Sequence, residues 1–437
     1  MRSPFSLLER TPLGSARPAL PKWQPTPLLS LGGIAAALLA CGFFPPSLHG
    51  ADAPSPSPVT VSGSYTAEVL TVASGGIRQG SAFRGLAEAD VQADLAALGA
   101  REGTVFHLSV LGPSGSDVSA RYLGDLQGAS NITTYNHLLL YELSLAGRFA
   151  GGRVDLKVGR LLADCEFAVT DSSAALLNSS FGWPTFISAN TRNTGPAFDR
   201  SALGVHAGVK LSPTLRFQAG VYDGDTFDSP NGDPSRYADG LSFRLSRSQG
   251  AFGIAELDLT PHPAQAESAP VASVKLGVWA HTADFADQCV ASRCHHGNGG
   301  IYAAGELPLW SQAGVADQPG RHLTAFARAG VCPSDRDRVS QAAEAGLCAA
   351  GIVPGRGLDL LSLGLAYAGI GGYARQAERN CGVLNPSDYE LALEANYQFC
   401  LGSRFQVVPD LQWIHHPGAS PLQKDALVYG LRTQVTF

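Results

Sequence analysis

The sequence predicts an all-β fold, a transmembrane antiparallel β-barrel of about sixteen strands with a long loop folded into its lumen. Three observations predict it. Apolar and polar residues alternate with a period of two through residues 389–437 and through many shorter segments. Turn sequences rich in glycine, proline and serine separate these segments. The chain also ends on an aromatic residue, Phe437, that still belongs to the last alternating segment.

The C-terminal stretch shows the alternation most clearly. In residues 389–399, tyrosine, leucine, alanine and phenylalanine fall on one parity, and the parity that holds Glu390 and Glu394 is polar. Residues 404–413 and 427–437 repeat this pattern. A soluble β-sandwich also alternates, but its apolar parity faces a protein core and its last strand usually carries a polar tail. We therefore expect the apolar parity to face lipid and the polar parity to line a water-filled lumen.

The N-terminal segment is predicted to be a secretory signal peptide, residues 1–53, followed by a flexible lead-in, residues 54–62. Basic residues from Arg2 to Lys22 precede an apolar run at residues 28–44, and Ala51-Asp52-Ala53 supplies an A-x-A cleavage site. Residues 38–41 weakly resemble a lipoprotein cleavage sequence, but the ordinary site that follows is favoured. The barrel then occupies residues 63–437.

Composition limits what the mature chain can be. The 437 residues carry a net charge of -6 and a pI near 6.0, so the basic surface that nucleic-acid binding requires is missing. After residue 53, no uninterrupted apolar run is long enough to cross a bilayer as a helix. Because every backbone polar group must be satisfied in lipid, a membrane-spanning chain of this composition must form a closed barrel.

The predicted strands follow the alternating segments in chain order. They are residues 65–69, 87–95, 104–111, 137–148, 154–158, 203–211, 214–222, 241–246, 251–259, 274–281, 300–306, 322–329, 358–367, 389–399, 404–413 and 427–437. Tight and extended connections alternate, as periplasmic turns and outer loops do in bacterial barrels. Residues 283–297 and 332–357 are inconveniently long connections, which indicates that one strand pair there is misplaced.

One segment, residues 162–200, breaks the alternation over a length too great for an ordinary loop. It holds Asp164, Glu166, Trp183, Arg192 and Asn193. We expect this segment to fold into the lumen and to narrow it.

Cysteines and acidic clusters raise the question of bound metals. Seven cysteines remain after residue 53, and an odd number leaves at least one thiol unpaired within the chain. The C-x4-C-H-H sequence from Cys289 to His296 lacks the second half of a zinc site, so a small disulfide loop is favoured. The acidic loop from Asp223 to Asp233 lacks the register of an EF-hand, and calcium there is the only cofactor that the sequence suggests.

Five motifs occur in order along the chain. They are G-D-L-Q-G-A-S-N-I at residues 124–132, G-R-L at 159–161 followed by Asp164 and Phe167, N-S-S-F-G-W-P at 178–184, V-Y-D-G-D at 221–225, and P-D-L-Q-W-I-H-H-P-G at 409–418. Together they span essentially the whole mature chain and resemble the carbohydrate-selective porins, the OprB-like family. The resemblance implies a channel in the outer membrane of a Gram-negative-type bacterium that passes monosaccharides, glucose above all.

A sugar channel must replace the water hydrogen bonds that its substrate gives up, since an unmade bond in a confined site costs on the order of 1–3 kcal/mol. Arginine supplies donors, carboxylates supply acceptors, and an indole offers an apolar platform for a sugar face. The candidate sugar-binding residues are Arg84, Glu88, Arg160, Asp164, Glu166, Trp183, Arg192, Asn193, Glu394 and Arg432. Arg160 lies on the outward parity and needs a bulge or a strand end to turn it inward. The alternative role of such charges is to solvate a wide interior or to brace the inserted loop.

We therefore predict a passive outer-membrane channel selective for carbohydrates. A glycoside hydrolase would need one distinct carboxylate pair, and no pair stands out on a wall that bears many, so no enzyme activity is expected. No G-x-x-x-x-G-K-[ST] sequence is present to couple transport to a nucleotide. The alternative is a general or anion-preferring porin without sugar selectivity. The expected partners are the carbohydrate, outer-membrane lipid and, through the C-terminal Phe437, the barrel-assembly machinery.

Overall fold

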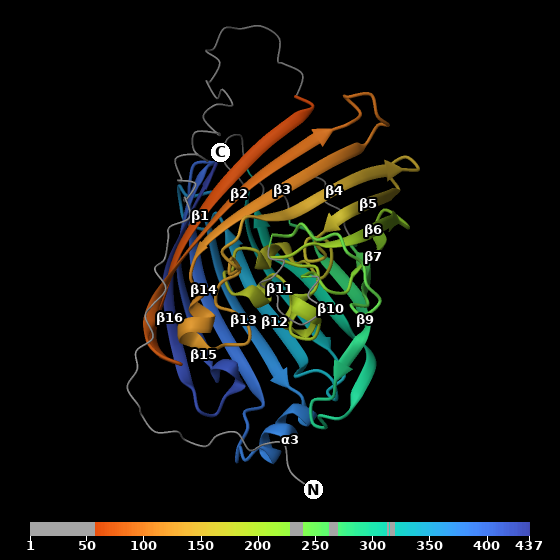
Figure 1. Cartoon of the computed structure of the whole chain (residues 1–437). Helices are drawn as coiled ribbons and strands as arrows, with labels where there is room; N and C mark the ends of the chain where they lie inside the picture. The colour runs from red at the N-terminus through yellow and green to blue at the C-terminus, as the bar shows by residue number, and fades with distance from the viewer. Residues whose placement is uncertain (1–56, 228–238, 262–269, 313, 315–319) are drawn as a thin grey trace, which may run out of the picture. The chain divides into compact units, whose positions relative to one another are not determined.

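Alternating residues give each strand one apolar and one polar face, and in the computed structural model these strands close into a barrel (Figure 1). The structure describes residues 57–227, 239–261, 270–312, 314 and 320–437. These residues form sixteen strands: β1 (Val59–Gly76), β2 (Gly80–Asp94), β3 (Thr104–Gly115), β4 (Leu139–Phe149), β5 (Val154–Leu161), β6 (Ala202–Lys210), β7 (Leu215–Asp223), β8 (Ala251–Leu259), β9 (Ser273–Ala286), β10 (Cys294–Gln312), β11 (Arg321–Val331), β12 (Val339–Ala350), β13 (Leu360–Ile370), β14 (Tyr389–Leu401), β15 (Phe405–His415) and β16 (Lys424–Thr436).

Every strand pairs antiparallel with its neighbours in the chain, and β1 pairs with β16 to close the sheet. The predicted antiparallel barrel of sixteen strands is therefore confirmed. The helical segments are all short: η1 (Ser119–Leu123), η2 (Asp171–Ser173), η3 (Ser179–Phe181), α2 (Thr185–Ser188), η4 (Arg192–Thr194), α3 (Gly372–Asn380) and η6 (Pro417–Ala419). Among the described residues, no helix has the length and apolar character needed to cross a membrane.

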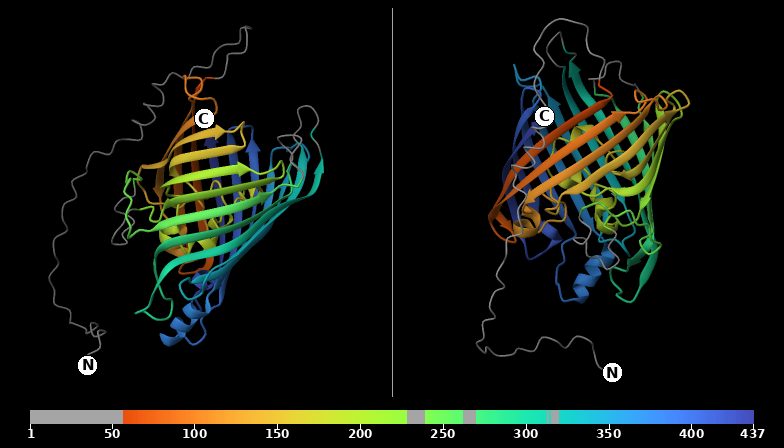
Figure 2. Two further views of the ribbon diagram at one scale, coloured as in Figure 1. Left: turned by 90° about the vertical axis from the view of Figure 1, so that its right-hand side faces the viewer. Right: turned by 45° about the horizontal axis from the view of Figure 1, so that its top comes forward.

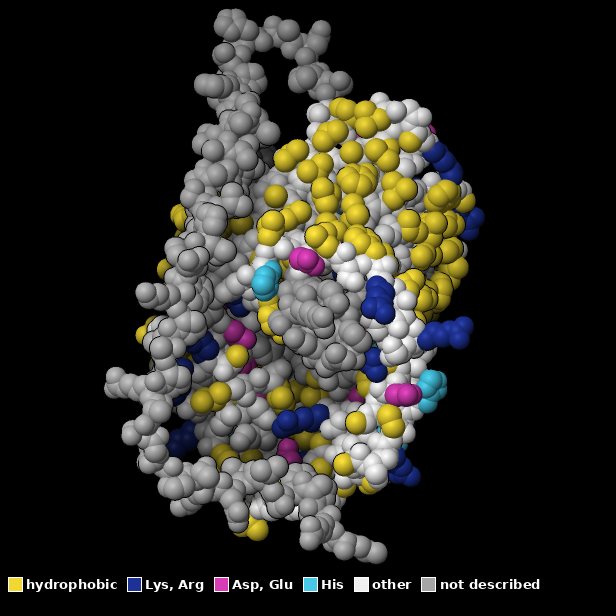
Figure 3. Space-filling model, in the orientation of Figure 1, with side chains coloured by type: hydrophobic (Ala, Val, Ile, Leu, Met, Phe, Trp, Pro, Cys, Tyr) yellow, Lys and Arg dark blue, Asp and Glu magenta, His cyan; other side chains and the backbone are white. Residues whose placement is uncertain are grey.

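Strand β14 shows how the two faces are used. Leu393 keeps 39% of its surface exposed on the outside and pairs in register with Leu365 and Trp413, which are also exposed. Glu390 and Glu394, on the opposite parity, are completely buried inside. Hydrophobic side chains cover much of the outer surface of the first strands, and charged side chains gather towards the opposite end of the molecule (Figure 3). The apolar parity therefore forms the outer surface of the barrel.

The connections differ in length at the two ends of the barrel (Figure 2). At one end, which we call the turn end, residues 150–153, 211–214 and 402–404 join strands tightly. At the other, which we call the loop end, residues 116–138, 162–201 and 371–388 form long connections. In bacterial barrels the short turns are periplasmic and the long loops are extracellular.

The predicted strand count is right because two errors cancel. Residues 241–246 alternate in sequence but form no strand, and the strand β12 was missed within the long connection at residues 332–357. The outward residues of β12 include Gln341, Ala343 and Ala345, which give little contrast between apolar and polar parity. The excessive length of that connection was the sequence signal for the missing strand.

The N-terminal prediction needs one correction. Strand β1 begins at Val59, and residues 59–62 pair with residues 90–93 of β2, so the last part of the predicted flexible lead-in belongs to the barrel. The predicted signal peptide and residues 54–56 lie outside the described residues. At the other terminus, the backbone N–H of Phe437 donates to the Gly63 carbonyl at 2.8 Å. Recognition of Phe437 by the assembly machinery stays a prediction.

A charge on the outer face of β14 should destabilise the barrel. We expect Leu393→Arg to lower the free energy of unfolding from lipid vesicles by about 2–4 kcal/mol, because the position lies near the middle of a lipid-facing strand. Urea titration followed by tryptophan fluorescence would measure the change. Leu393→Ala is the control and should cost clearly less. Equal stability of the arginine variant and the wild type would contradict the assignment of this face to lipid.

Candidate functional site

The connection between β5 and β6, residues 162–201, runs inside the barrel (Figure 1). We call it the inserted loop. Its residues contact inward-facing side chains on strands that lie far apart around the sheet, including Glu256 of β8, Arg328 of β11 and Glu394 of β14. We call residues 116–138, between β3 and β4, the second loop. The two loops are joined directly, since the Ser179 N–H donates to the Gly128 carbonyl at 2.8 Å.

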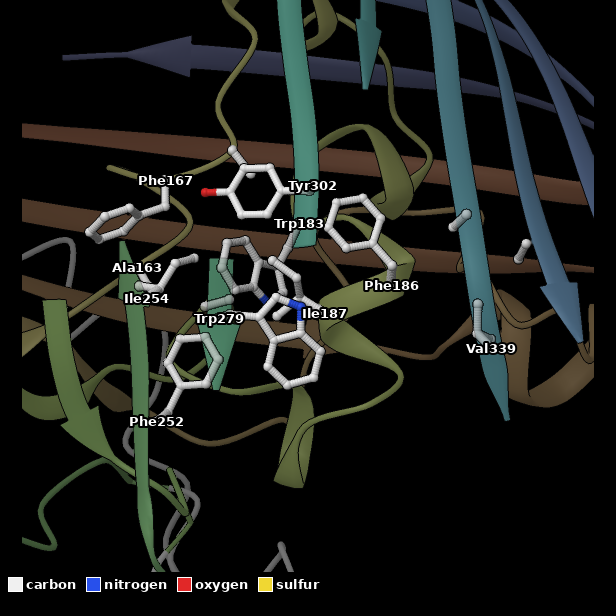
Figure 4. Packing of buried hydrophobic residues seen from close by; sticks show 14 of the residues in the cluster. Ala163, Phe167, Trp183, Phe186, Ile187, Phe252, Ile254, Trp279, Tyr302 and Val339 are labelled. Carbon is white, nitrogen blue, oxygen red and sulfur yellow. The ribbon is translucent and has the colours of Figure 1, made fainter. Parts of the chain in front are cut away.

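Aromatic packing holds one side of the inserted loop against strands β8 to β10 (Figure 4). The loop side chains Phe167, Trp183, Phe186 and Ile187 pack with wall residues Phe252, Ile254, Trp279 and Tyr302, and all eight are buried. Phe186 stacks on Tyr302 with ring centroids 5.7 Å apart. Burial of such large side chains is the main source of docking energy. Here the inward parity is apolar, contrary to the expected polar lining, because this part of the wall receives the loop.

Buried glutamates of the wall hold the other side of both loops. Glu394 accepts the N–H groups of Leu177 and Asn178 at 2.5 and 2.9 Å. Glu390 accepts those of Leu126 and Gln127, in the second loop, at 2.8 and 3.0 Å. A carboxylate that receives two successive backbone N–H groups makes strong, charge-assisted bonds and satisfies donors that would otherwise be buried without partners.

The same arrangement recurs on β10, and an arginine complements it. Glu306 accepts the N–H groups of Asp171 and Ser172 at 3.0 and 2.7 Å. Arg328 of β11 donates to the carbonyls of Ala168 and Ser180, each at 2.6 Å, and pairs with Glu344 of β12. Wall carboxylates thus satisfy loop donors, and a wall guanidinium satisfies loop acceptors. For Glu394, the bracing role that the sequence left open as an alternative is the role the contacts show.

A cavity of about 480 Å³ lies between the two loops. Its lining combines carboxylates, amides, hydroxyls and aromatic rings, and includes no lysine or arginine. The lining residues are Asp117, Ser119, Leu126, Gln127, Gly128, Ser130, Asn131, Thr133, Asp164, Ser179, Gly182, Trp183, Thr185, Ser188, Ala189, Thr194, Phe198 and Asp199. Of the ten predicted sugar-binding residues, Asp164 and Trp183 line this cavity.

Asp164 is fixed at the start of the inserted loop. Its Oδ2 accepts the Phe198 N–H at 2.7 Å, which ties the two ends of the loop together. Its Oδ1 has no hydrogen-bond partner among the described residues. Burial raises the pKa of Asp164 to about 6, and the bond from Phe198 opposes that rise. The carboxylate is therefore charged at neutral pH and loses its charge in mild acid.

Arg84 of β2 does not line the cavity, but its guanidinium is close to two acidic residues that do. Its side chain is buried, and Nη1 donates to Asn136 Oδ1 of the second loop at 2.8 Å. The cavity residues Asp117 and Asp199 interact electrostatically with its guanidinium. Asp199 also accepts a hydrogen bond from Thr134. The structure thus brings Arg84 next to acidic groups on both loops.

A chain of charges runs along the wall on β2 to β5 and reaches the inserted loop. His107 bridges Asp90 and Glu142 at 3.1 and 3.4 Å. Lys157 then pairs with Glu142 at 2.8 Å and with Glu166 at 3.5 Å. The predicted site residue Glu166 therefore belongs to this network on the polar wall. Opposite charges alternate along this network. The wall therefore carries many polar groups, while the electrostatic fields of neighbouring charges largely cancel.

The other predicted residues lie elsewhere. Glu88 is only half-buried on β2 and accepts a long bond, 3.5 Å, from Ser109. Arg192 donates to the Ser248 carbonyl at 2.9 Å, and Asn193 donates to Asp225 at 2.7 Å, so both point away from the cavity. Arg432 pairs with Glu68 of β1 at 2.5 Å, on another part of the wall.

Arg160 keeps its outward parity. It is buried because residues 241–246, the segment wrongly predicted as a strand, cover it. Its guanidinium donates to the Ser201 and Ser242 carbonyls, and Phe243 lies against it with the ring centroid 5.5 Å away. Arg160 thus fastens the end of the inserted loop to a covering segment on the outer face, and no bulge turns it inward.

Sequence reasoning missed the contribution of the second loop. Asp117, Gln127, Asn131 and Thr133 line the cavity, yet this stretch was predicted only as a long connection. Two of these four, Gln127 and Asn131, fall within the motif at residues 124–132, which carried the family resemblance. Core packing does not determine the sequence of a connection between strands, so a motif of that kind found there indicates a functional role. It was the signal available from the sequence.

The structure bears on the disulfide prediction and on part of the metal-site prediction. The described residues include no cluster of three or more His, Cys, Asp or Glu with the geometry of a metal site. Part of the predicted calcium loop, residues 228–233, lies outside the described residues. Cys289 and Cys294 are free thiols, so the favoured small disulfide loop is not formed.

Removal of one buried carboxylate should loosen the inserted loop. We expect Glu394→Ala to lower the free energy of unfolding by about 3 kcal/mol, because two buried N–H groups lose a charged partner. Single-channel recordings should show a larger and noisier conductance. Glu88→Ala is the matched control, since Glu88 contacts neither loop, and it should retain wild-type stability. An unchanged conductance of Glu394→Ala would show that this residue does not hold the loop.

Comparison with known proteins places the chain in a family. A model of the carbohydrate-selective porin, OprB family, matches residues 78–437. A search of curated proteins gives no significant match. Among solved structures, Pseudomonas putida OprB at high pH is similar with a TM-score of 0.73 and 20% identity, covering 93% of this chain and 97% of that one. The low-pH structure of that protein gives a TM-score of 0.52 at 16% identity, covering 94% and 97%.

A general porin shares the architecture more distantly. Salmonella typhi OmpF in complex with daunomycin has a TM-score of 0.51 at 7% identity, covering 87% of this chain and 97% of that one. At these identities the solved structures show a common fold, a porin barrel, and the family model carries the assignment. Since that model covers most of the sequence, the chain belongs to the carbohydrate-selective porins of the OprB family and is a sugar-selective channel of the Gram-negative outer membrane.

Proposed function

We propose that glucose and related monosaccharides cross this channel through the cavity between the inserted loop and the second loop. One observation carries the proposal: the cavity sets acidic and amide side chains opposite aromatic rings, on two loops whose backbones are fixed by wall residues. A pyranose has the matching character, with hydroxyl groups at its rim and apolar C–H groups on its faces.

Hydrogen bonding in the cavity suits a neutral polyol. Asp117, Asp164 and Asp199 offer acceptors, and Asn131 adds its Oδ1, which has no hydrogen-bond partner among the described residues. Trp183 supplies the apolar surface, and its indole N–H is already satisfied by the Thr194 carbonyl at 2.9 Å. The indole is therefore held in one orientation, which lowers the entropic cost of presenting its face to a sugar.

Binding must stay weak, because a channel that holds its substrate tightly blocks itself. Transport is passive in this proposal, driven by the sugar gradient alone. Several modest hydrogen bonds, each exchanged with water at a net gain of about 0.5–1.5 kcal/mol, satisfy this requirement. The family and the fold are those of channels, and we propose no reaction for the cavity carboxylates.

The alternative of an anion-preferring porin fits the cavity poorly. Three carboxylates line it and no basic residue does, and the neighbouring Arg84 and Arg200 interact with Asp199, so an anion meets no free cationic group in the lining. A general porin without sugar preference is the remaining alternative. It would pass glucose and an amino acid of similar size at equal rates in a liposome swelling assay.

We also propose that outer-membrane lipid surrounds the exposed apolar parity and that the assembly machinery reads the C-terminal end of β16. The supporting observations are the exposed leucines of β14 and β15 and the exposed side chain of Phe437, which keeps 74% of its surface accessible. Delayed assembly of Phe437→Ser in cells, with normal refolding of the purified variant, would support the role of Phe437.

Asp164 offers the most conservative test of the cavity. We expect Asp164→Asn to reduce the glucose swelling rate about threefold, because the amide keeps the bond from Phe198 but loses a charged acceptor. The swelling rates of proteoliposomes in glucose, sucrose and an amino acid would be compared. Asp94→Asn, an exposed aspartate at the turn end, is the control. An equal loss of all three solutes would indicate a narrowed pore rather than lost sugar recognition.

The raised pKa of Asp164 predicts a pH dependence of ion selectivity. Since its pKa is about 6, the carboxylate is charged at pH 8 and mostly neutral at pH 5. We expect the ratio of cation to anion permeability, from reversal potentials in a salt gradient, to fall as the pH is lowered through 6. Asp164→Asn should begin at the lower ratio and change less. A pH response identical in the variant and the wild type would assign the titration to other groups.

A further inference from the structure

We propose a second carbohydrate-binding site on the opposite side of the inserted loop, facing the turn end of the barrel. It deepens the proposed function, on which it rests, by adding a separate subsite for the same class of neutral sugar. The site is a cavity of about 330 Å³, within the range of small-molecule pockets. It is lined by Asp171, Ala174, Ala175, Leu177, Cys348, Leu360, Gln398, Gln406, Val408, Arg432 and Gln434.

The inserted loop separates this cavity from the first one. Residues 174–177 line the second cavity, and residues 179–183 line the first. Between these two stretches, the N–H groups of Leu177 and Asn178 are fixed to Glu394. The partition is therefore a piece of backbone tied to the wall.

The wall of the second cavity lies at the turn end. Gln398 and Gln406 flank the tight turn at residues 402–404, and Gln434 lies close to the end of β16. Gln406 and Gln434 are directly opposite each other in the antiparallel register of β15 and β16. Gln398 faces the first residue of β13, Leu360, across the neighbouring pair. Amides from three adjacent strands thus converge on one space.

These amides are available to a ligand. Among the described residues, no hydrogen bond engages the side chain of Gln406 or Gln434, and both are only half-buried. Gln398 makes a single weak contact, at 3.8 Å, with the Cys400 sulfur. Each amide offers two donors and an acceptor, the combination that sugar hydroxyls require. The three amides are half-buried and line the cavity, so they can bond a ligand that enters it.

Arg432 adds donors in a fixed position without adding net charge. Its Nε donates to Glu68 Oε2 at 2.8 Å, and the two side chains form an ion pair at 2.5 Å. Glu68 itself accepts the Ser130 hydroxyl hydrogen at 2.6 Å, so the pair is linked to the second loop. Because Glu68 neutralises the guanidinium, the site favours a neutral hydroxylated ligand over a phosphate or a carboxylate.

An apolar surface faces the polar row. Ala174, Ala175 and Leu177 of the inserted loop contribute it, and Val408 and Leu360 add apolar groups beside the amides on the wall. A sugar can therefore turn its C–H face to the loop and its hydroxyl rim to the amides. Two weak sites in series, one on each side of a partition, allow a sugar to leave the first site without returning to bulk water in one step.

The test uses the full-length protein reconstituted in planar bilayers, always inserted from the same chamber. Glucose is added to one side at a time, and the current noise or partial block that it causes gives an apparent affinity for each side. We expect Gln406→Ala combined with Gln434→Ala to weaken the affinity about tenfold for glucose added at the turn-end side and to leave the other side unchanged. Asp164→Asn, in the first cavity, should show the reverse asymmetry.

The outcomes separate the two proposals. If the glutamine variant matches the wild type from both sides while Asp164→Asn weakens one side, the second site is overturned and the proposed function stands. If glucose leaves the wild-type current unaffected from either side, both are overturned. The conservative variant Gln434→Asn, with unchanged thermal stability and an intermediate affinity, would distinguish lost recognition from a damaged fold. Mannitol, a flexible acyclic polyol, should bind more weakly than glucose at both sites because it must be ordered first.

Discussion

The structure depends on one repeated interaction, a glutamate on the inner face of the barrel wall that accepts two successive backbone N–H groups from a loop. Glu390, Glu394 and Glu306 each make it, on three different strands. A loop inside a barrel cannot satisfy its backbone with the sheet, whose N–H and C=O groups are already paired. Side chains of the wall must therefore supply the missing partners, and glutamate reaches far enough to receive two donors at once.

Because the wall must supply these partners, the two sides of the lumen differ in the side chains that they carry. Strands β8 to β10 carry aromatic residues inward and receive the apolar side of the inserted loop, while β2 to β5 carry the chain of charges from Asp90 to Glu166. The inserted loop is held on both sides, and it also bonds to the second loop through Ser179 and Gly128. Some residues around the cavity between the loops, such as Asp164, take part in this anchoring as well.

Much of the architecture could be predicted from sequence, because alternation directly reports which residues face lipid. The class of fold, the strands near the C-terminus and the intrusion of residues 162–200 follow from periodicity and length. Strand β12 was missed because alanine and glycine carry little hydrophobic contrast, and residues 241–246 were overpredicted because a covering segment on the outer face also alternates. The sequence pattern within a segment does not show which other segments will pack against it in the folded protein.

The site was harder to predict for a related reason. Parity shows that Glu394 points inward, but only the fold shows that a loop distant in sequence meets it there. The same holds for Arg160, whose outward position is tolerable only because Ser242 and Phe243 cover it. Asp164 and Trp183, which line the cavity, were predicted because they lie on the one segment whose length demanded a special role. The contribution of Asp117 and Asn131 depends on a contact between two loops, which no single-sequence pattern encodes.

The anchoring of the inserted loop has a consequence for the order of assembly. The bond from Leu177 to Glu394 joins residues 217 positions apart in the chain, and the bond from Leu126 to Glu390 joins residues 264 positions apart. Contacts of such long range form late, after the intervening chain has been organised. A nascent barrel that lacks its final strands can pack the loop against β8 to β11 but lacks the anchors on β14, so one side of the loop stays unfastened until the C-terminal strands join the sheet. The narrowed pore is thus completed last, in the same step that closes the barrel.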